Sequence, residues 1–512
     1  MSEWTGGYVA EIAYTHGYYA ELNPLRIKLA FLNAGYVFPE AGTACELGFG
    51  QGVSTNVHAA ASLTRWYGTD FNPSQAGFAQ DLAAASGADV QLYDEAFDEF
   101  CTRPELPQFD FIALHGIWSW ISDANRQVIV DFVRRKLKVG GAVYISYNTQ
   151  PGWAAMVPLR NLLAEHAQLM AAPGDGIVPR IDASLAFAEK VLGSGALYGR
   201  ANPSVVSRLK HLHGQNRQYL AHEYFNQDWM PMSFSNLRGW LQEAKLTFAC
   251  SATYLDHVDA VNLSADQQQL LKELPDRMFR ETVRDFMVNT YFRKDYWVRG
   301  ARELSQLERI ESLRRLRFVL TVPRHQVSFK VTGALGESSM NEDVYRPVLD
   351  FFADHQIHSF HDLEKFVAAA GIRFEALLQA VLVLTAKSAL QPAQDDMVIA
   401  KTLPAATRLN RKLCETARHT DAVGAMVSPV VGGAINLGRV DKLFLLALAS
   451  GASSPQESGR FVMRALAASG TRLLVGGKLP ESTEAELDEA VRLGRAFTEV
   501  LLPLLKALRI EC

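Results

Sequence analysis

Cysteine is rare in this chain, net charge is small, and long hydrophobic runs are missing. The five cysteines, Cys45, Cys101, Cys250, Cys414 and Cys512, are scattered over 512 residues and show no paired spacing. This pattern argues against a zinc site or a disulfide-bonded scaffold and predicts free thiols in a reducing compartment. The formal net charge of −4 argues against a general nucleic-acid-binding protein.

Membrane and metal signals are missing as well. The first residues, MSEWTGG, have no basic, apolar signal. The most apolar later stretch, around residues 443–448, is far shorter than the ~20 residues that a membrane-spanning helix needs. The histidines do not cluster with acids at metal-ligand spacing. We therefore expect a cytoplasmic protein with no metal and no membrane contact.

From residue 43 onward, strand-like and helix-like segments alternate. This alternation predicts a mostly parallel sheet with helices on both faces. Strands are expected at 43–47, 65–69, 89–92, 109–114 and 142–147, with helices at 53–63, 73–86 and 123–137. After a helical stretch, the α/β pattern resumes with a possible strand at 219–225, a helix at 235–244 and a strand at 246–254.

The length of the chain indicates several domains. Changes in pattern divide it into an α/β core, a helical insertion that caps it, a return to the core, a helical region and a mainly helical C-terminal domain. The expected boundaries are 1–150, 151–218, 219–258, 259–324 and 325–512.

Residues 46–52, ELGFGQG, form the most informative segment. A strand ends there, and Gly48, Gly50 and Gly52 predict a tight turn into a helix, with backbone that approaches a ligand closely. The next strand ends at Asp70, where a carboxylate can bind the hydroxyls of a ribose. Together these features are typical of the front half of a nucleoside-binding α/β unit.

The turn favours S-adenosylmethionine, whose product is S-adenosylhomocysteine, over a dinucleotide. A dinucleotide turn has a third glycine where this chain has Val53. Glu46 would repel a pyrophosphate and would balance a sulfonium or ammonium. Asp94, after the third strand, is a candidate partner for the adenine amino group, or a solvated loop acid. A turn that only reverses the chain remains an alternative.

Two aromatic segments follow the fourth and fifth strands, HGIWSW at 115–120 and NTQPGW at 148–153. Ligands bind at the carboxyl ends of such strands. The tryptophans there, including Trp118, would line a cleft that attracts an ammonium or would pack domains together. His115 is a candidate base or orienter, or a turn-stabilising residue. Tyr14, Tyr18 and Tyr147 would contact an acceptor amine or lie in the core.

At this point the chain resembles a known family. The resemblance is to class I methyltransferases with a methyltransferase regulatory domain, typified by rickettsial protein lysine methyltransferases that act on an outer-membrane protein. The matching motifs are YYAELNPLR (18–26), ELGFGQG (46–52), GTDFNP (68–73), FDFIALHGIWSW (109–120), YISYNTQPGW (144–153), YLAHEYF (219–225) and DFMVNTYFR (285–293).

The resemblance implies an α/β Rossmann-like fold with a helical insertion, mainly helical middle and C-terminal domains of winged-helix-like character, and a homodimer. It implies that S-adenosylmethionine is bound by the glycine turn and Asp70, with Asp94 near adenine. The cofactor-binding residues expected from the turn, the strand ends and the motifs are Glu46, Gly48, Phe49, Gly50, Gly52, Asp70, Phe71, Asp94 and His115.

The function expected is S-adenosylmethionine-dependent methyl transfer to a protein, at lysine side chains. The residues expected at the reacting groups are His115, Trp118, Tyr147 and Tyr18. Methyl transfer needs alignment more than a strong acid or base. Two alternatives stay open: a methyltransferase for a sugar or another small metabolite, and a non-catalytic S-adenosylmethionine-binding interaction protein.

Overall fold

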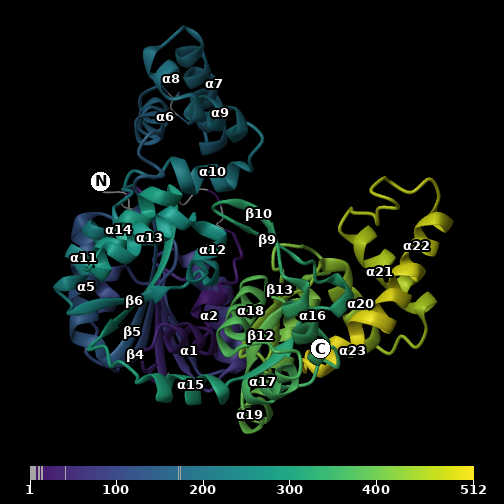
Figure 1. Cartoon of the computed structure of the whole chain (residues 1–512). Helices are drawn as coiled ribbons and strands as arrows, with labels where there is room; N and C mark the ends of the chain where they lie inside the picture. The colour runs from purple at the N-terminus through teal and green to yellow at the C-terminus, as the bar shows by residue number, and fades with distance from the viewer. Residues whose placement is uncertain (1–6, 10–11, 13–14, 41, 171, 173) are drawn as a thin grey trace.

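A computed structural model describes residues 7–9, 12, 15–40, 42–170, 172 and 174–512. Its centre is a seven-stranded sheet of order β3-β2-β1-β4-β5-β7-β6, in which only β7 is antiparallel to its neighbours (Figure 1). The predicted α/β fold is therefore confirmed. The strands are β1 (Thr43–Leu47), β2 (Arg65–Thr69), β3 (Val90–Tyr93), β4 (Phe109–Leu114), β5 (Leu137–Asn148), β6 (Leu246–Ser251) and β7 (Phe292–Arg299).

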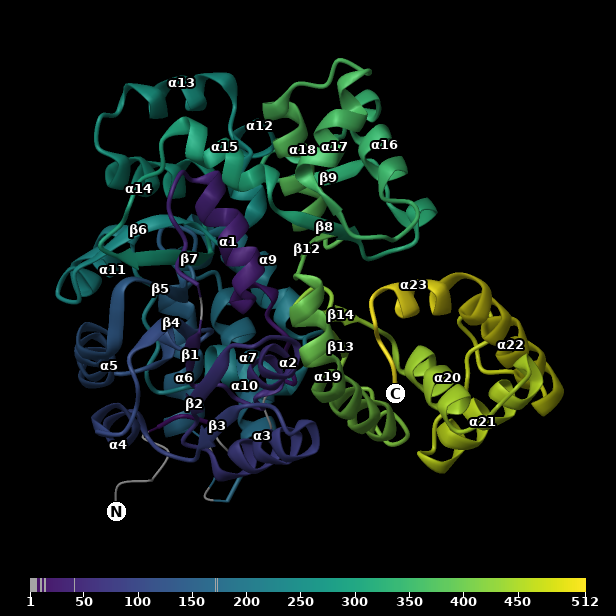
Figure 2. The same cartoon turned by 90° about the horizontal axis from the view of Figure 1, so that it is seen from below.

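Helices cover both faces of this sheet because side chains alternate along each strand. In β4, Ile112 and Leu114 pack on one face with α4, α5 and α11, whereas Phe111 and Ala113 pack on the other face with α1. Figure 2 shows the sheet between these layers. The helices of the core are η1 (Ala20–Leu22), α1 (Pro24–Asn33), α2 (Val53–Ala61), α3 (Pro73–Ser86), α4 (Phe97–Thr102), η2 (Trp118–Trp120), α5 (Asp123–Lys136) and α11 (Phe234–Gln242).

Local capping sets where the core helices begin. The side chains of Asn23, Asn72 and Ser122 accept backbone N–H groups at the starts of α1, α3 and α5. Pro24 and Pro73 occupy the first turn, where a missing N–H costs nothing. These signals are local, which is why the helix starts expected at residues 73 and 123 agree with the structure.

A helical insertion follows β5 and rises above the sheet in Figure 1. It has its own core, which contains Trp153, Leu163, Leu185 and Tyr224. Its helices are α6 (Val157–Leu169), α7 (Ile177–Gly193), α8 (Leu197–Ala201), α9 (Pro203–Leu212) and α10 (Arg217–Tyr224). The possible strand at 219–225 is wrong, because residues 219–224 belong to α10, and the Asn216 side chain caps the start of this helix.

The region expected to be helical after residue 258 contains a strand of the main sheet, next to its edge. It begins with η3 (Tyr254–His257), α12 (Asp259–Asn262), α13 (Ala265–Glu273) and α14 (Arg277–Val288), and then forms β7 between β5 and β6. The charges of Arg293 and Asp295 hid this strand in the sequence. In the fold they neutralise each other, with Arg293 Nε 2.9 Å from Asp295 Oδ2, and both are buried.

The C-terminal region is mostly helical and packs on the core. Helix α19 contacts α2 and α3, and Phe318 and Val381 join the core beneath the sheet. Its elements are α15 (Gln306–Arg314), β8 (Arg317–Leu320), η4 (Arg324–Gln326), β9 (Lys330–Gly333), β10 (Gly336–Ser339), α16 (Glu342–Phe351), β11 (His358–Ser359), α17 (Phe360–Ala368), α18 (Phe374–Ala386), β12 (Leu390–Ala393), α19 (Asp396–Thr416), β13 (Ala425–Ser428), β14 (Gly433–Asn436), α20 (Arg439–Ala449), α21 (Pro455–Ala468), α22 (Thr483–Ala496), η5 (Phe497–Leu501) and α23 (Leu502–Ala507).

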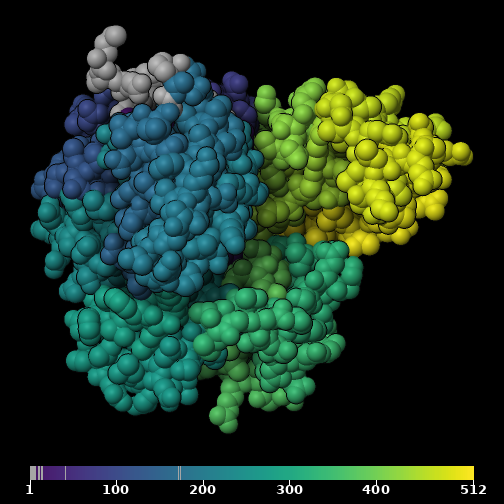
Figure 3. All heavy atoms as spheres, turned by 90° about the horizontal axis from the view of Figure 1, so that it is seen from above, coloured from purple at the N-terminus to yellow at the C-terminus, as the bar shows by residue number. Residues whose placement is uncertain are grey.

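The last helices form a lobe at the side of the molecule, coloured yellow in Figure 3.

Strand β8 pairs with both β11 and β12 to make a small antiparallel sheet. The winged-helix-like character expected for this region stays a prediction, as do the domain boundaries.

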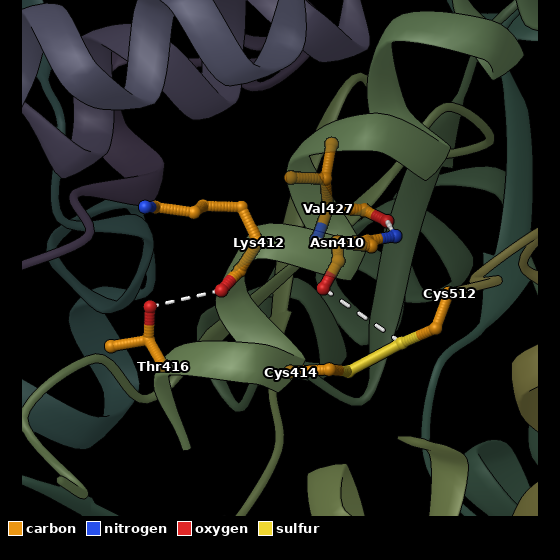
Figure 4. Close-up of a disulfide and its surroundings, with 6 residues drawn as sticks. All are labelled: Asn410, Lys412, Cys414, Thr416, Val427 and Cys512. Atoms are coloured by element: carbon orange, nitrogen blue, oxygen red, sulfur yellow. Dashed lines mark hydrogen bonds between the residues drawn. A yellow bond between two sulfur atoms is a disulfide. The ribbon is translucent and has the colours of Figure 1, made fainter. Parts of the chain in front are cut away.

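The structure pairs two of the cysteines that were expected to be free. Cys414, in α19, and Cys512, at the last position, form a disulfide across 98 residues of sequence (Figure 4). Cys45, Cys101 and Cys250 are free and buried. The expectation of five free thiols is therefore wrong, because spacing along the chain does not show which cysteines the fold brings together.

Within the described ranges, no helix is both long and apolar enough to cross a membrane.

Candidate functional site

A cavity of about 200 Å³ lies at the carboxyl ends of β1, β2 and β4. This is where ligands bind in open α/β sheets. The cavity is lined by the glycine turn, the segments after β2, β3 and β4, part of the N-terminal segment, and the chain after α10. These residues are Gly7, Tyr8, Thr15, Gly17, Tyr19, Gly48, Phe49, Gly50, Gln51, Asp70, Phe71, Gln75, Glu95, Ala96, Phe97, His115, Gly116, Ile117, Trp120, Ile121, Asn125, Asn226 and Asp228.

The predicted glycine turn has the backbone that only glycine adopts easily. The φ angles of Gly48, Gly50 and Gly52 are +71°, +57° and +63°. A Cβ at Gly48 would lie 2.3 Å from Ile117 Cδ1, and one at Gly52 would lie 2.4 Å from the Ala79 Cβ. Gly48 and Gly50 line the cavity, whereas Gly52 lets α2 pack closely on α3.

Asp70 lies at the cavity wall and is held by two backbone groups. Its Oδ2 accepts the N–H of Gly50 at 2.8 Å, and its Oδ1 accepts the N–H of Asn72 at 3.0 Å. Burial raises the pKa of Asp70 to about 6, and the two hydrogen bonds oppose this shift. Each carboxylate oxygen keeps a lone pair free, so Asp70 can still accept hydrogen bonds from a ligand.

Glu46 does not line the cavity, contrary to its expected role there. Its side chain is buried and accepts a hydrogen bond from the Thr55 hydroxyl of α2. Burial raises the pKa of Glu46 to about 8, opposed by that hydrogen bond and assisted by the nearby charge of Asp70. At neutral pH this carboxyl is mainly protonated, so it links β1 to α2 and does not balance a cationic ligand.

Asp94 is exposed and does not line the cavity, whereas the next residue, Glu95, does. One oxygen of Glu95 pairs with the guanidinium of Arg103. The other, Oε2, is buried and has no hydrogen-bond partner among the described residues. A buried acceptor without a donor is costly. Glu95 therefore has an acceptor available for a ligand N–H, the role expected of Asp94.

His115 lines the cavity at the end of β4, as expected. Its Nδ1 lies 2.8 Å from the Tyr144 hydroxyl of β5, and Tyr19 stacks on its ring with 3.4 Å between centroids. Burial lowers the pKa of His115 to about 3; the Glu21 charge opposes this shift and the Lys294 charge adds to it. The imidazole is therefore neutral throughout the physiological range.

The other three residues expected at the reacting groups lie elsewhere. Trp118 is fully buried, and its Nε1 donates to the sulfur of Met232 at 3.1 Å. Tyr147 is fully buried, and its hydroxyl donates to Asp295 Oδ2 at 3.0 Å. Tyr18 reaches the C-terminal region, where its hydroxyl accepts the N–H of Ala434 at 3.0 Å. These expectations fail because adjacent aromatic positions face different ways.

Two neighbours of those residues line the cavity instead: Trp120, at the other end of η2, and Tyr19, which follows Tyr18. Trp153 is also away from the cavity and packs in the core of the insertion. The motifs thus marked the correct segments, but the sequence did not show which aromatic residue of each segment faces the ligand.

Described residues of the N-terminal segment, among them Tyr8 and Tyr19, line the cavity. The N–H of Val9 donates to Asn226 Oδ1 at 2.8 Å, and the ring of Tyr8 lies 5.7 Å from that of Phe71. Tyr14, a candidate contact for an acceptor amine, lies outside the described residues. Phe49 and Phe71 line the cavity as expected.

The charges of the cavity have one sign. Its described lining includes three carboxylates, Asp70, Glu95 and Asp228, and neither lysine nor arginine. Within the described chain, no group of histidines, cysteines and acids is arranged to hold a metal ion. The arrangement suits a ligand with positive charge and hydroxyl or amino donors.

Comparison with known proteins places the chain among methyltransferases. Residues 216–299 match the predicted methyltransferase regulatory domain, a stretch that includes α10, α11 and strands β6 and β7. PKMT2 from Rickettsia typhi, solved in complex with AdoHcy, has a similar fold. Its TM-score is 0.69 at 14% identity, over 97% of this chain and 99% of that chain.

Two relatives are similar in sequence. Protein RP789 of Rickettsia prowazekii is 25% identical over 55% of this chain and 51% of its own length. Protein sll1526 of Synechocystis is 39% identical over 99% of this chain and 100% of its own length. With that identity over the full length, this chain and the Synechocystis protein belong to one family. The matched regulatory domain and the fold shared with PKMT2 identify this chain as a class I methyltransferase with a methyltransferase regulatory domain.

Proposed function

We propose that this protein is an enzyme that transfers the methyl group of S-adenosylmethionine. The observation that carries the proposal is the cavity itself, which combines a glycine turn with three carboxylates and, in its described lining, no basic side chain. A dinucleotide brings two phosphates to such a turn, whereas S-adenosylmethionine brings a sulfonium and an ammonium. The carboxylates therefore favour S-adenosylmethionine.

Each part of the cofactor has a matching group in the cavity. Asp70 would accept the ribose hydroxyls, because its two oxygens are already aligned by the turn. Glu95 would accept the adenine amino group through its unpartnered Oε2. The backbone of Gly48 and Gly50 leaves room for the methionine part. These assignments replace Glu46 and Asp94 with residues that line the cavity.

When bound, S-adenosylmethionine supplies a methyl carbon that a nucleophile displaces in line, and the electrons of the broken bond pass to sulfur. The protein mainly supplies alignment and a site without water. His115, Tyr19 and Trp120 line the cavity and would limit how an acceptor enters.

The methyl acceptor that we propose is a protein, at lysine side chains. Two observations support this: the resemblance to rickettsial protein lysine methyltransferases, and the similarity to PKMT2 along nearly the full length of both chains. The N-terminal segment and the chain that follows α10 line the cavity, and they would give a macromolecule a surface to bind. A homodimer and a cytoplasmic location remain predictions from the sequence.

Two measurements test the proposal. Calorimetry should show S-adenosylmethionine and S-adenosylhomocysteine binding, and no binding of NAD. Binding of NAD without the sulfonium compound would refute the cofactor. Incubation with labelled S-adenosylmethionine and lysate should then label a protein. Label found only among small molecules would refute the protein acceptor, and cofactor binding without turnover in any fraction would refute the enzymatic role.

A further inference from the structure

The ring of His115 is fixed on several sides. Tyr19 stacks on one face at 21° between planes, and the ring of Tyr144 lies parallel to it, 5.8 Å away. Its Nδ1 is 2.8 Å from the Tyr144 hydroxyl. Among the described residues, Nε2 has no hydrogen-bond partner and is not sealed from the cavity. The question is which nitrogen of His115 holds the proton.

The surroundings of Tyr144 answer this question. Tyr144 is fully buried, and among the described residues its hydroxyl forms a hydrogen bond with His115 Nδ1, at 2.8 Å, and with no other acceptor. If Nδ1 carried the hydrogen, the buried hydroxyl hydrogen of Tyr144 would have no acceptor, which is costly. The Tyr144 hydroxyl therefore donates to Nδ1 of His115.

Burial keeps both Tyr144 and His115 neutral. Burial raises the pKa of Tyr144, so the phenol keeps its proton. Burial lowers the pKa of His115 to about 3. The ionic groups near the ring are Glu21, ahead of α1, and Lys294, on β7, which pair with each other at 2.5 Å. A neutral imidazole that accepts a hydrogen bond at Nδ1 carries its hydrogen at Nε2.

Arg26 of α1 and Tyr296 of β7 are the remaining titratable groups of these elements near Glu21. The hydroxyl of Tyr296 donates to the Glu21 carbonyl at 2.6 Å, and Arg26 donates to Gln391 Oε1 at 2.8 Å. Neither side chain therefore forms its hydrogen bond with the imidazole, and His115 remains in the neutral form with its hydrogen on Nε2.

We propose that Tyr144 is a positioning residue that fixes His115 as an Nε2–H donor facing the cavity. His115 then holds an oxygen atom of the bound ligands and does not remove the proton of the methyl acceptor. The oxygen belongs to the methionine carboxylate or to a carbonyl of the substrate. This inference rests on the proposed function for the identity of the ligand, and on the hydrogen bond between Tyr144 and His115 for the state of the imidazole.

The proposed state of His115 determines where the proton of the acceptor amine goes. With His115 unable to accept a proton at Nε2, the amine gives its proton to water before the methyl group is transferred. The value of kcat/KM should then rise with pH in proportion to the free amine, without a break from His115 between pH 5 and 8.

Nitrogen NMR on histidine-labelled protein tests the first part without turnover. The His115 signal, identified by its loss in His115→Gln, should show hydrogen on Nε2 in the wild type. In Tyr144→Phe the donor to Nδ1 is gone, and a population with hydrogen on Nδ1 should appear. Hydrogen on Nδ1 in the wild type would overturn the proposal.

Kinetics test the second part, with His115→Gln as the conservative variant because its amide N–H can replace the Nε2–H but cannot act as a base. His115→Gln should lose no more than ~10-fold in kcat/KM, and His115→Ala about 100-fold. If His115→Gln is as impaired as His115→Ala, and the wild-type profile breaks near neutral pH, His115 is a base and the proposal is wrong.

Calorimetry then identifies the oxygen. If the cofactor affinity of His115→Ala falls by the same factor as its kcat/KM, the oxygen belongs to the methionine carboxylate. If only the KM of the acceptor changes, the oxygen belongs to the substrate. Hydrogen on Nε2 in a protein that transfers no methyl group would support the positioning role and refute only the proposed function.

Discussion

At the scale of single residues, burial decides what each carboxyl group near the glycine turn can do. Glu46 lies in β1, Asp70 follows the neighbouring strand β2, and both are buried. Asp70 is held by two N–H donors and reaches the cavity, whereas Glu46 faces α2 and bonds to a hydroxyl. A carboxyl group with two N–H donors retains its charge more easily than one with a single hydroxyl donor. Asp70 is therefore the acid that we propose for ligand binding.

Asp70→Asn should weaken S-adenosylmethionine binding by ~10-fold to 100-fold, because a charged acceptor of hydrogen bonds is lost. Asp94→Asn is the matched control, since Asp94 is exposed and off the cavity wall. Its affinity should equal that of the wild type by calorimetry. Equal weakening in both variants would contradict the arrangement of the site.

Glu46 predicts a pH dependence of stability. Its folded pKa of about 8 lies above its ordinary value of 4.5, so the folded state binds an additional proton between these values. The stabilisation is complete below pH 4.5 and is lost as pH rises through 8. Glu46→Gln should flatten this decline by at least about 1 kcal/mol, measured by denaturant unfolding from pH 5 to 9.

Exposed Glu40 provides the control for that series. Glu40→Gln should keep the wild-type slope. A slope in Glu46→Gln that matches the wild type would show that Glu46 is ionised in the folded protein.

Trp118 and Trp120 should separate stability from binding. Trp118 is fully buried, so Trp118→Ala should cost about 3–5 kcal/mol of stability by creating a cavity in the core. Trp120 lines the ligand cavity, and Trp120→Phe should lower cofactor affinity or turnover with a smaller loss of stability. Thermal unfolding and calorimetry on both variants check this; a stable, inactive Trp118→Ala would refute it.

At the scale of elements, the turn between β1 and α2 joins the ligand site to helix packing. Gly52 begins α2 with a left-handed conformation and lies against Ala79 of α3. Helix α2 is buried along its whole length, between the sheet and α19. The same glycine thus fixes the direction of the turn and the distance between two helices.

Gly52→Ala should destabilise the protein by about 1–3 kcal/mol through overpacking, and it should weaken cofactor binding because the turn shifts. Gly77→Ala is the matched control in α3, since nothing lies within 4 Å of its added Cβ. Because Gly77 is exposed in a helix, Gly77→Ala should raise the free energy of unfolding by up to about 1 kcal/mol. Thermal unfolding of both variants tests this prediction. A Gly52→Ala variant as stable as the wild type would contradict the close contact between Gly52 and Ala79.

At the scale of the whole molecule, the C-terminal region is part of the structure that supports the site. Gln394 donates to the carbonyl of Ala61 at the end of α2, at 2.7 Å, and Asn23 donates to the carbonyl of Val431 at 2.8 Å. The hydroxyl of Tyr18 accepts the N–H of Ala434. The helices next to the glycine turn are therefore held by residues some 300 to 400 positions later in the chain.

The disulfide predicts a thiol count. Unfolded without reductant, the protein should label at three cysteines, Cys45, Cys101 and Cys250, and after reduction at all five. The double variant Cys414→Ser, Cys512→Ser should lose about 2–5 kcal/mol of stability, because the bond closes a long loop. Five labelled cysteines without reductant would show that the bond is absent.

The sequence by itself determined the features that local physics sets. Alternating apolar segments, Asn and Ser caps and glycines with positive φ fix the strands, the helices and the turn, because each depends on a few neighbouring residues. They were enough to predict the α/β sheet, which the structure confirms, and they directed attention to the turn and Asp70, which line the cavity.

Only the tertiary structure decided which member of each local pair reaches the cavity. Trp120 and Tyr19 line it while Trp118 and Tyr18 do not, and Glu95 lines it while Asp94 does not. The strand β7 and the Cys414–Cys512 bond also depend on partners far along the chain. The physical reason is that orientation, burial and the neutralisation of charge come from packing between distant segments, and no short stretch of sequence contains both partners.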